Sequence, residues 1–134
     1  MKLIYNTGSN RIVDLVQALL FDGHRLDAVT HALSVFACEP LLDRLNRTEQ
    51  CRVVLPDNAS SLPFLGSPAD RSARNRLQSR WLAACVRDWL AAKADIRLAS
   101  GDIPQGAVIV RDSSYSPTQA FLGSLALTTD GLGL

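Results

Sequence analysis

Short β-branched runs alternate with helix-patterned stretches along this chain of 134 residues. The clearest strand pattern covers residues 107–111, and a second compact run at 51–55 is stopped by Pro56. Between them, apolar residues recur at steps of four or five, which predicts a helix over about 70–93. Alternation of this kind predicts an α/β domain in which helices pack on a sheet.

Weaker signals extend the same pattern to both ends of the chain. Ser9-Asn10 precedes an apolar run with helical spacing, which predicts a helix over about 10–21. A second helix is expected at 39–45, with Pro40 in its first turn. Further short strands are expected at 26–31, 95–99 and 121–123. Residues 56–69 read as the only linker-like stretch, either a lid or a surface excursion.

Charge and cysteine content exclude several classes of protein. Lys and Arg total 14 and Asp and Glu total 13, so the net charge of +1 predicts no general attraction to anionic polymers. The three cysteines form no Cys-x-x-Cys pair, so free buried thiols, a cytoplasmic location, no metal and no cofactor are expected. The sequence shows neither a leader nor an apolar run long enough to span a membrane, so no membrane partner is expected.

The last thirty residues carry the most specific pattern in the chain. A strand beginning near Gln105 is followed by a short hairpin and then by Gly123-Ser124. This arrangement resembles the signature of the phospholipase D superfamily, His-x-Lys-x4-Asp followed by Gly-Ser-x-Asn-Leu-Thr. The positions of that signature fall, in order, on Gln105, Ala107, Asp112, Gly123, Ser124, Ala126, Leu127 and Thr128.

The resemblance implies a phosphodiester chemistry that these residues cannot perform. In the superfamily the histidine attacks phosphorus, a second copy protonates the leaving group, and the lysine and asparagine hold the phosphate oxygens. The amide of Gln105 is neither a nucleophile nor an acid or base at neutral pH, and Ala107 and Ala126 carry no polar side-chain atom. Asp112 is expected to accept hydrogen bonds from the backbone or from Ser124. His24 is expected in a turn and His31 in a strand, and nothing in the sequence brings either to the missing position.

Upstream segments resemble one branch of the superfamily, the phospholipase D-like domain at the N-terminus of bacterial Swi/Snf-type helicases. The similar segments are 3–6, 26–29, 32–36 and 74–77, together with the tryptophan-containing helix that follows. The resemblance implies one domain over 1–134, folded as an α/β/α sandwich with a mixed sheet, and a helicase motor in the same chain. No Gly-x4-Gly-Lys-Ser/Thr loop occurs in these residues, so this part is not itself the ATPase.

One local basic feature stands out against the balanced charge. It comprises Arg71, Arg74, Arg76, Arg80 and Arg87. On a helix, Arg76, Arg80 and Arg87 share a stripe that suits backbone phosphates of a nucleic acid, DNA above all. The alternative is a solvated helix face opposite an apolar side on which Trp81 and Trp89 are expected to be buried.

The sequence therefore predicts a catalytically degenerate accessory domain that binds nucleic acid or acts as a scaffold beside a helicase. One alternative is an active phosphodiesterase or nuclease that has moved its catalytic groups, with Asp112, Ser113 and Ser114 as the nearby candidates. The other is a homodimerisation module, since members of the superfamily with a single motif pair two copies to complete one site.

Overall fold

The computed structural model describes residues 2–8, 10–57 and 78–134. The helical elements are α1 (Ile12–Leu19), α2 (Val35–Cys38), the 3-10 helix η1 (Glu39–Leu41), α3 (Leu42–Arg47), α5 (Ser79–Lys93) and α6 (Thr129–Leu132). The strands are β1 (Arg25–Val29), β2 (Gln50–Pro56), β3 (Ala94–Ala99), β4 (Gly106–Arg111) and β5 (Pro117–Gly123). The predicted α/β class and mixed sheet are confirmed.

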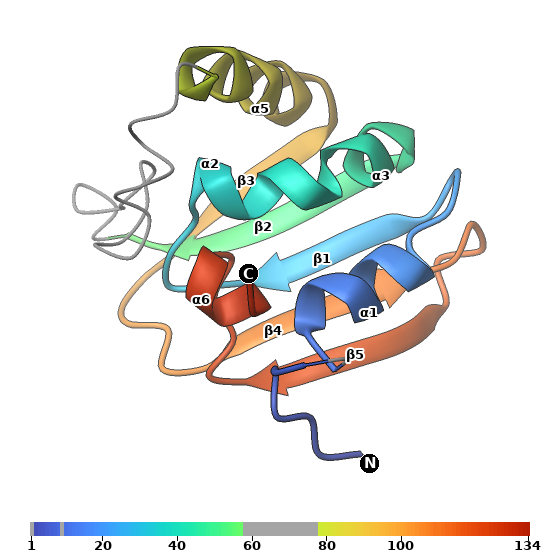
Figure 1. Ribbon diagram of the computed structural model, residues 1–134, viewed down its shortest axis with the longest axis vertical. Helices are drawn as coiled ribbons and strands as arrows, with labels where there is room; N and C mark the ends of the chain where they lie inside the picture. The colour runs from blue at the N-terminus through green and yellow to red at the C-terminus, as the bar shows by residue number, and fades with distance from the viewer. Residues whose placement is uncertain (1, 9, 58–77) are drawn as a thin grey trace.

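The five strands form one sheet in the order β3-β2-β1-β4-β5 (Figure 1). The first three are parallel, with Ala28 opposite Val53 and Val53 opposite Ile96. β4 runs antiparallel to both β1 and β5. The carboxyl ends of β1, β2, β3 and β5 therefore lie at the edge where β4 begins.

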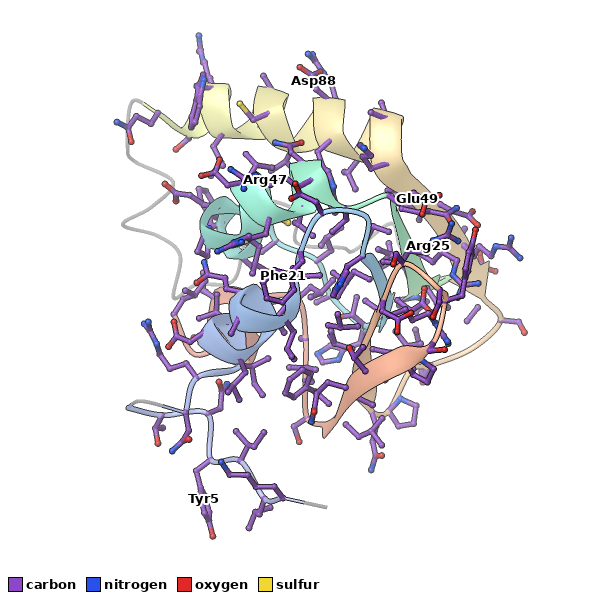
Figure 2. The ribbon with its side chains drawn as sticks, turned by 90° about the vertical axis from the view of Figure 1, so that its right-hand side faces the viewer. Tyr5, Phe21, Arg25, Arg47, Glu49 and Asp88 are labelled. Atoms are coloured by element: carbon purple, nitrogen blue, oxygen red, sulfur yellow. The ribbon has the colours of Figure 1, made fainter. Side chains whose placement is uncertain are left out.

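The described helices all pack on one face of this sheet (Figures 1 and 2). Alternate strand residues point into that layer and are at most 6% exposed: Leu26, Ala28, Cys51, Val53, Leu55, Val108, Val110 and Phe121. The opposite face carries charged and small apolar residues. No described helix covers it, and we call it the uncovered face. The second helical layer of an α/β/α sandwich is therefore not among the described residues.

Asn6 caps α1, whereas a cap was expected at Ser9-Asn10, of which Ser9 lies outside the described residues. The side-chain carbonyl oxygen of Asn6 accepts a hydrogen bond of 2.8 Å from the backbone N–H of Ile12, while the flanking Arg11 makes no side-chain cap. The amide of Asn6 also donates to the carbonyl of Gly131 at 3.0 Å, in the unpredicted helix α6. One side chain thus joins the beginning of the chain to its end.

The apolar stripe of α5 is rotated relative to the prediction. Leu82, Val86 and Trp89 form the buried face, which contacts α2 and α3, and Trp89 is 4% exposed. Trp81 is 63% exposed, so its predicted burial is wrong. Steps of four and three along the helix place residues 82, 86 and 89 together. Trp81 lies outside that stripe because it precedes Leu82 by one residue, a rotation of about 100°.

Two further expectations have a different outcome. β5 begins at Pro117, so the last strand is longer than the predicted 121–123. The linker-like stretch 56–69 begins inside β2, whose last residue is Pro56, and Asp57 follows in a turn. The rest of that stretch lies outside the described residues.

Candidate functional site

The motif positions at the start of β4 and the end of β5 lie together at one edge of the sheet, which we call the motif edge. Gly106 pairs with Gly123. Gln105 directly precedes this pair on the β4 side, and Ser124 directly follows it on the β5 side. Both side chains are exposed. Gly123 has a φ of 143°, a backbone conformation that favours glycine. This edge also holds the carboxyl ends of the parallel strands, where α/β proteins commonly bind ligands.

The side chains at this edge provide little chemistry. Gln105 offers only an amide, and Ala107 presents a methyl group on the uncovered face of the sheet. Ala126 is 5% exposed and lies under α6, where a Cβ on Gly131 would come within 2.2 Å of its carbonyl oxygen. A larger polar side chain at position 126 would therefore have to be accommodated in the interior of the protein.

Asp112 lies at the opposite end of β4, in the hairpin that leads to β5. Its carboxylate accepts hydrogen bonds from the backbone N–H of Ser114 at 2.9 Å, the hydroxyl of Ser114 at 2.6 Å and the N–H of Ser116 at 3.0 Å. The hydroxyl of Ser114 and these backbone donors hold the pKa of Asp112 below its ordinary value. The predicted structural role is confirmed for the backbone bonds, but Ser124 is not a partner.

This position also separates Asp112, Ser113 and Ser114 from Gln105. Six strand residues at about 3.3 Å each place the hairpin about 20 Å from the start of β4. These three residues are therefore not near the missing histidine position, contrary to the sequence-based alternative.

His31 is the histidine that the fold brings to the motif edge. The last β1–β4 pair is Val29 with Ala107; His31 follows Val29 by two residues, and Gln105 precedes Ala107 by two. The buried hydroxyl of Thr30 accepts a hydrogen bond of 3.0 Å from the N–H of Leu127, which ties this end of β1 to the segment after β5. His24 lies at the other end of β1, with its Nδ1 2.9 Å from the carbonyl oxygen of Leu19.

Two members of the predicted arginine stripe lie on α5, and Arg71, Arg74 and Arg76 lie outside the described residues. Arg80 and Arg87 are both exposed, and Arg87 forms a 2.7 Å ion pair with Asp88. Helix α3, which packs beside α5, adds exposed Arg44 and Arg47. Arg44, Arg47 and Arg80 have no ion pair with a described residue.

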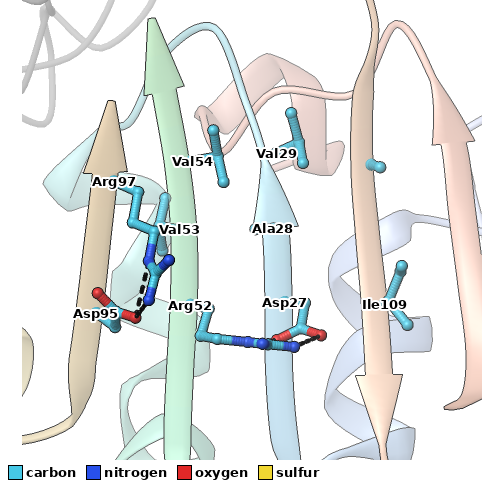
Figure 3. A pocket seen from close by; sticks show the side chains of 10 residues that line it. Asp27, Ala28, Val29, Arg52, Val53, Val54, Asp95, Arg97 and Ile109 are labelled. Atoms are coloured by element: carbon cyan, nitrogen blue, oxygen red, sulfur yellow. Dashed lines mark hydrogen bonds and ion pairs between the residues drawn. The ribbon is translucent and has the colours of Figure 1, made fainter. Parts of the chain in front are cut away.

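Asp27 organises the centre of the uncovered sheet face (Figure 3). Arg52 donates to both of its carboxylate oxygens, at 2.7 and 2.6 Å, and Arg111 donates to one at 2.6 Å. Partial burial by itself raises the pKa of Asp27, but the hydrogen bonds from the two arginines outweigh it and the net pKa is lowered. Beside this cluster lies an open hollow of about 250 Å³, with Val29 and Val54 among its lining residues.

The remaining arginines of this face are also paired. Arg97 bonds Asp95 at 3.1 Å, and Arg25 bonds Glu49 at 2.8 Å while its guanidinium lies 3.4 Å from the centre of the Tyr115 ring. Figure 2 shows Arg25 and Glu49 beside the sheet and Arg47 on the helical layer. Positive charge without a carboxylate partner is therefore concentrated on the helical side among the described residues.

The cysteines are free, as predicted. Burial raises the pKa of the Cys38 and Cys51 thiols to about 12, whereas Cys85 is only half-buried. No cluster of three or more His, Cys, Asp or Glu side chains suited to a metal occurs in 2–8, 10–57 or 78–134. Within the same ranges, no helix is long and apolar enough to cross a membrane.

Comparisons with protein-family models, curated proteins and solved structures find no match. The site features above therefore stand on the fold and its side chains alone. The uncovered face was not predicted from the sequence. A signal for it exists, because Arg-x-Asp in β1 and Asp-x-Arg in β3 place charged residues at alternate strand positions, as is usual for a sheet face without helices.

Proposed function

We propose that this chain is a catalytically degenerate phospholipase D-like domain that serves as an accessory binding module beside an ATP-dependent helicase motor in the same protein. The observation that carries the proposal is the motif edge itself. Gln105 and Ser124 meet there without a histidine, lysine or asparagine at the signature positions, and Asp112 stabilises a distant hairpin. The scaffold of the motif is retained while its chemical groups are replaced.

Nucleic acid is the binding partner that the charge distribution favours. Phosphate contacts need accessible arginines, and carboxylates already occupy those of the sheet face. Arg44 and Arg47 on α3 and Arg80 on α5 form an exposed group on neighbouring helices, which we call the helical arginine group; Arg87 on α5 is already paired with Asp88. Such contacts would hold the backbone of DNA without reading its sequence.

Duplex binding followed by fluorescence anisotropy over a salt series tests this proposal. Affinity should fall with salt, and Arg44→Gln with Arg80→Gln should reduce the slope of log K against log salt by about two, at about 0.9 per phosphate contact. Arg52→Gln with Arg97→Gln removes the same charge from the sheet face and should leave the slope unchanged. Equal losses from both pairs would show diffuse attraction, and no binding at low salt would contradict the nucleic-acid role.

His31 favours one second candidate, an active phosphodiesterase with a relocated nucleophile. His31 follows β1 at the motif edge, where Ser124 after β5 also carries an exposed hydroxyl. The arrangement lacks a described Lys or Arg among the motif positions to hold phosphate oxygens, which is why the noncatalytic function is proposed first. Turnover that depends on His31 would reverse that order.

A further inference from the structure

The uncovered face of the sheet is unusual for the strands that form it. All-parallel sheets occur almost only with both faces covered, because the connections between parallel strands place helices on the faces. Here β1, β2 and β3 are parallel, yet Arg52 and Arg97 keep 51% and 74% of their side chains exposed on this face. The apolar residues Val29 and Val54 line an open hollow between the charged pairs.

We infer that this face packs against the same face of a second copy of the chain, about a two-fold axis that lies between β1 and β2 and runs close to the strand direction. Such a dimer gives the proposed accessory module a scaffold role. It does not use the helical arginine group, so the two proposals can fail separately.

The registry of the strands makes the face complementary to itself. Asp27 is paired with Arg52, and Val29 with Val54, at successive levels of the same face. A two-fold axis along the strands and between them exchanges β1 and β2 while keeping each level. Arg52 then faces Asp27 of the second copy, and Val54 faces its Val29. Opposite charges meet at one level and apolar side chains at the next.

An axis across the strands at the level of Asp27 would instead place each strand of one copy over the same strand of the other, so Asp27 would face Asp27. Like charges in direct opposition are unfavourable. The charge pattern therefore favours the axis along the strands over one that crosses them at the level of Asp27.

The face offers a small contact area. Four overlapping strands spaced about 4.8 Å apart and about 17 Å long give a footprint of about 330 Å² per copy. Both copies together give about 660 Å², which is below the size of a standard specific interface, so a weak and transient dimer is expected.

Sedimentation equilibrium of the chain over a range of concentrations tests for the dimer. The wild type should approach twice the monomer mass at high concentration, and Val54→Asp should remain a monomer. Ala91→Asp, which adds the same charge on the exposed side of α5, is the matched control and should dimerise as the wild type does. A wild type that is monomeric at every concentration would overturn the inference.

Cysteine cross-linking locates the axis. In a Cys85→Ser background, a mixture of Val29→Cys and Val54→Cys chains should form a disulfide-linked dimer under mild oxidation, whereas Val54→Cys alone should cross-link several-fold less. Equal cross-linking of Val54→Cys with itself would contradict the axis. Cross-linking of Ser124→Cys chains without the Val29–Val54 link would place the dimer contact at the motif edge instead.

Discussion

Gly106 lies directly against the backbone of Leu125: a Cβ built on this glycine would stand 1.5 Å from the Leu125 carbonyl oxygen. This contact sets the first residue of β4 against the segment that follows β5. It therefore constrains the positions of Gln105 and Ser124 at the motif edge, because each directly precedes one of the two contacting residues.

Gly106→Ala should destabilise the protein strongly, because the added methyl group meets main chain that cannot rotate away. The expected loss in the free energy of unfolding is about 3 kcal/mol or more, beyond ordinary overpacking. Urea denaturation followed by circular dichroism measures it. Gln105→Ala, at the exposed neighbouring position, should change stability by less than about 0.5 kcal/mol, and a similar loss there would show that this edge is simply sensitive to substitution.

The two tryptophans should differ sharply in their contribution to stability. Trp89→Ala removes a buried ring and should cost about 3–5 kcal/mol, whereas Trp81→Ala removes an exposed one and should cost less than about 1 kcal/mol. Acrylamide quenching of the single-tryptophan proteins provides an independent measure. Stronger quenching of Trp89 than of Trp81 would contradict the orientation of α5.

Asp27 should make stability depend on pH in the acid range. Its folded pKa is lowered, so its contribution is complete above the unfolded value of about 3.9 and is lost as the pH falls through the folded pKa. Asp27→Asn should cost about 1 kcal/mol at neutral pH, a modest value because Arg52 is half exposed.

Urea denaturation of the wild type and Asp27→Asn between neutral and acid pH, at concentrations low enough to keep both monomeric, checks this dependence. The difference in the free energy of unfolding should shrink as the pH falls. A difference that stays constant or grows toward acid pH would show that the carboxylate charge is not what holds Arg52 and Arg111.

Periodicity along the chain was enough to predict the α/β class and most strands, because buried β-branched runs such as β4 have few alternative structures. It failed at Trp81, where large size and helical spacing suggested burial but a stripe through Leu82 and Val86 packs instead. Local rules also place the α1 cap at Ser9-Asn10, of which Ser9 lies outside the described residues, whereas Asn6 caps Ile12 from six residues away while it also bonds Gly131.

The candidate site was predictable only where residues are close in sequence. The spacing from Gln105 to Ser124 predicts a hairpin, so their meeting at one edge follows from the chain itself. The approach of His31 depends on the pairing of β1 with β4, which are about eighty residues apart, and no local pattern encodes that pairing. The Asp27 cluster likewise joins three strands.

The central claim is that the motif edge no longer performs phosphodiester chemistry, and turnover of a chromogenic phosphodiester by homogeneous protein from about pH 5 to about pH 9 tests it most directly. The account predicts a rate equal to that of the protein-free blank for the wild type, His31→Ala and Ser124→Ala alike. A wild-type rate above the blank that disappears in folded His31→Ala would contradict it.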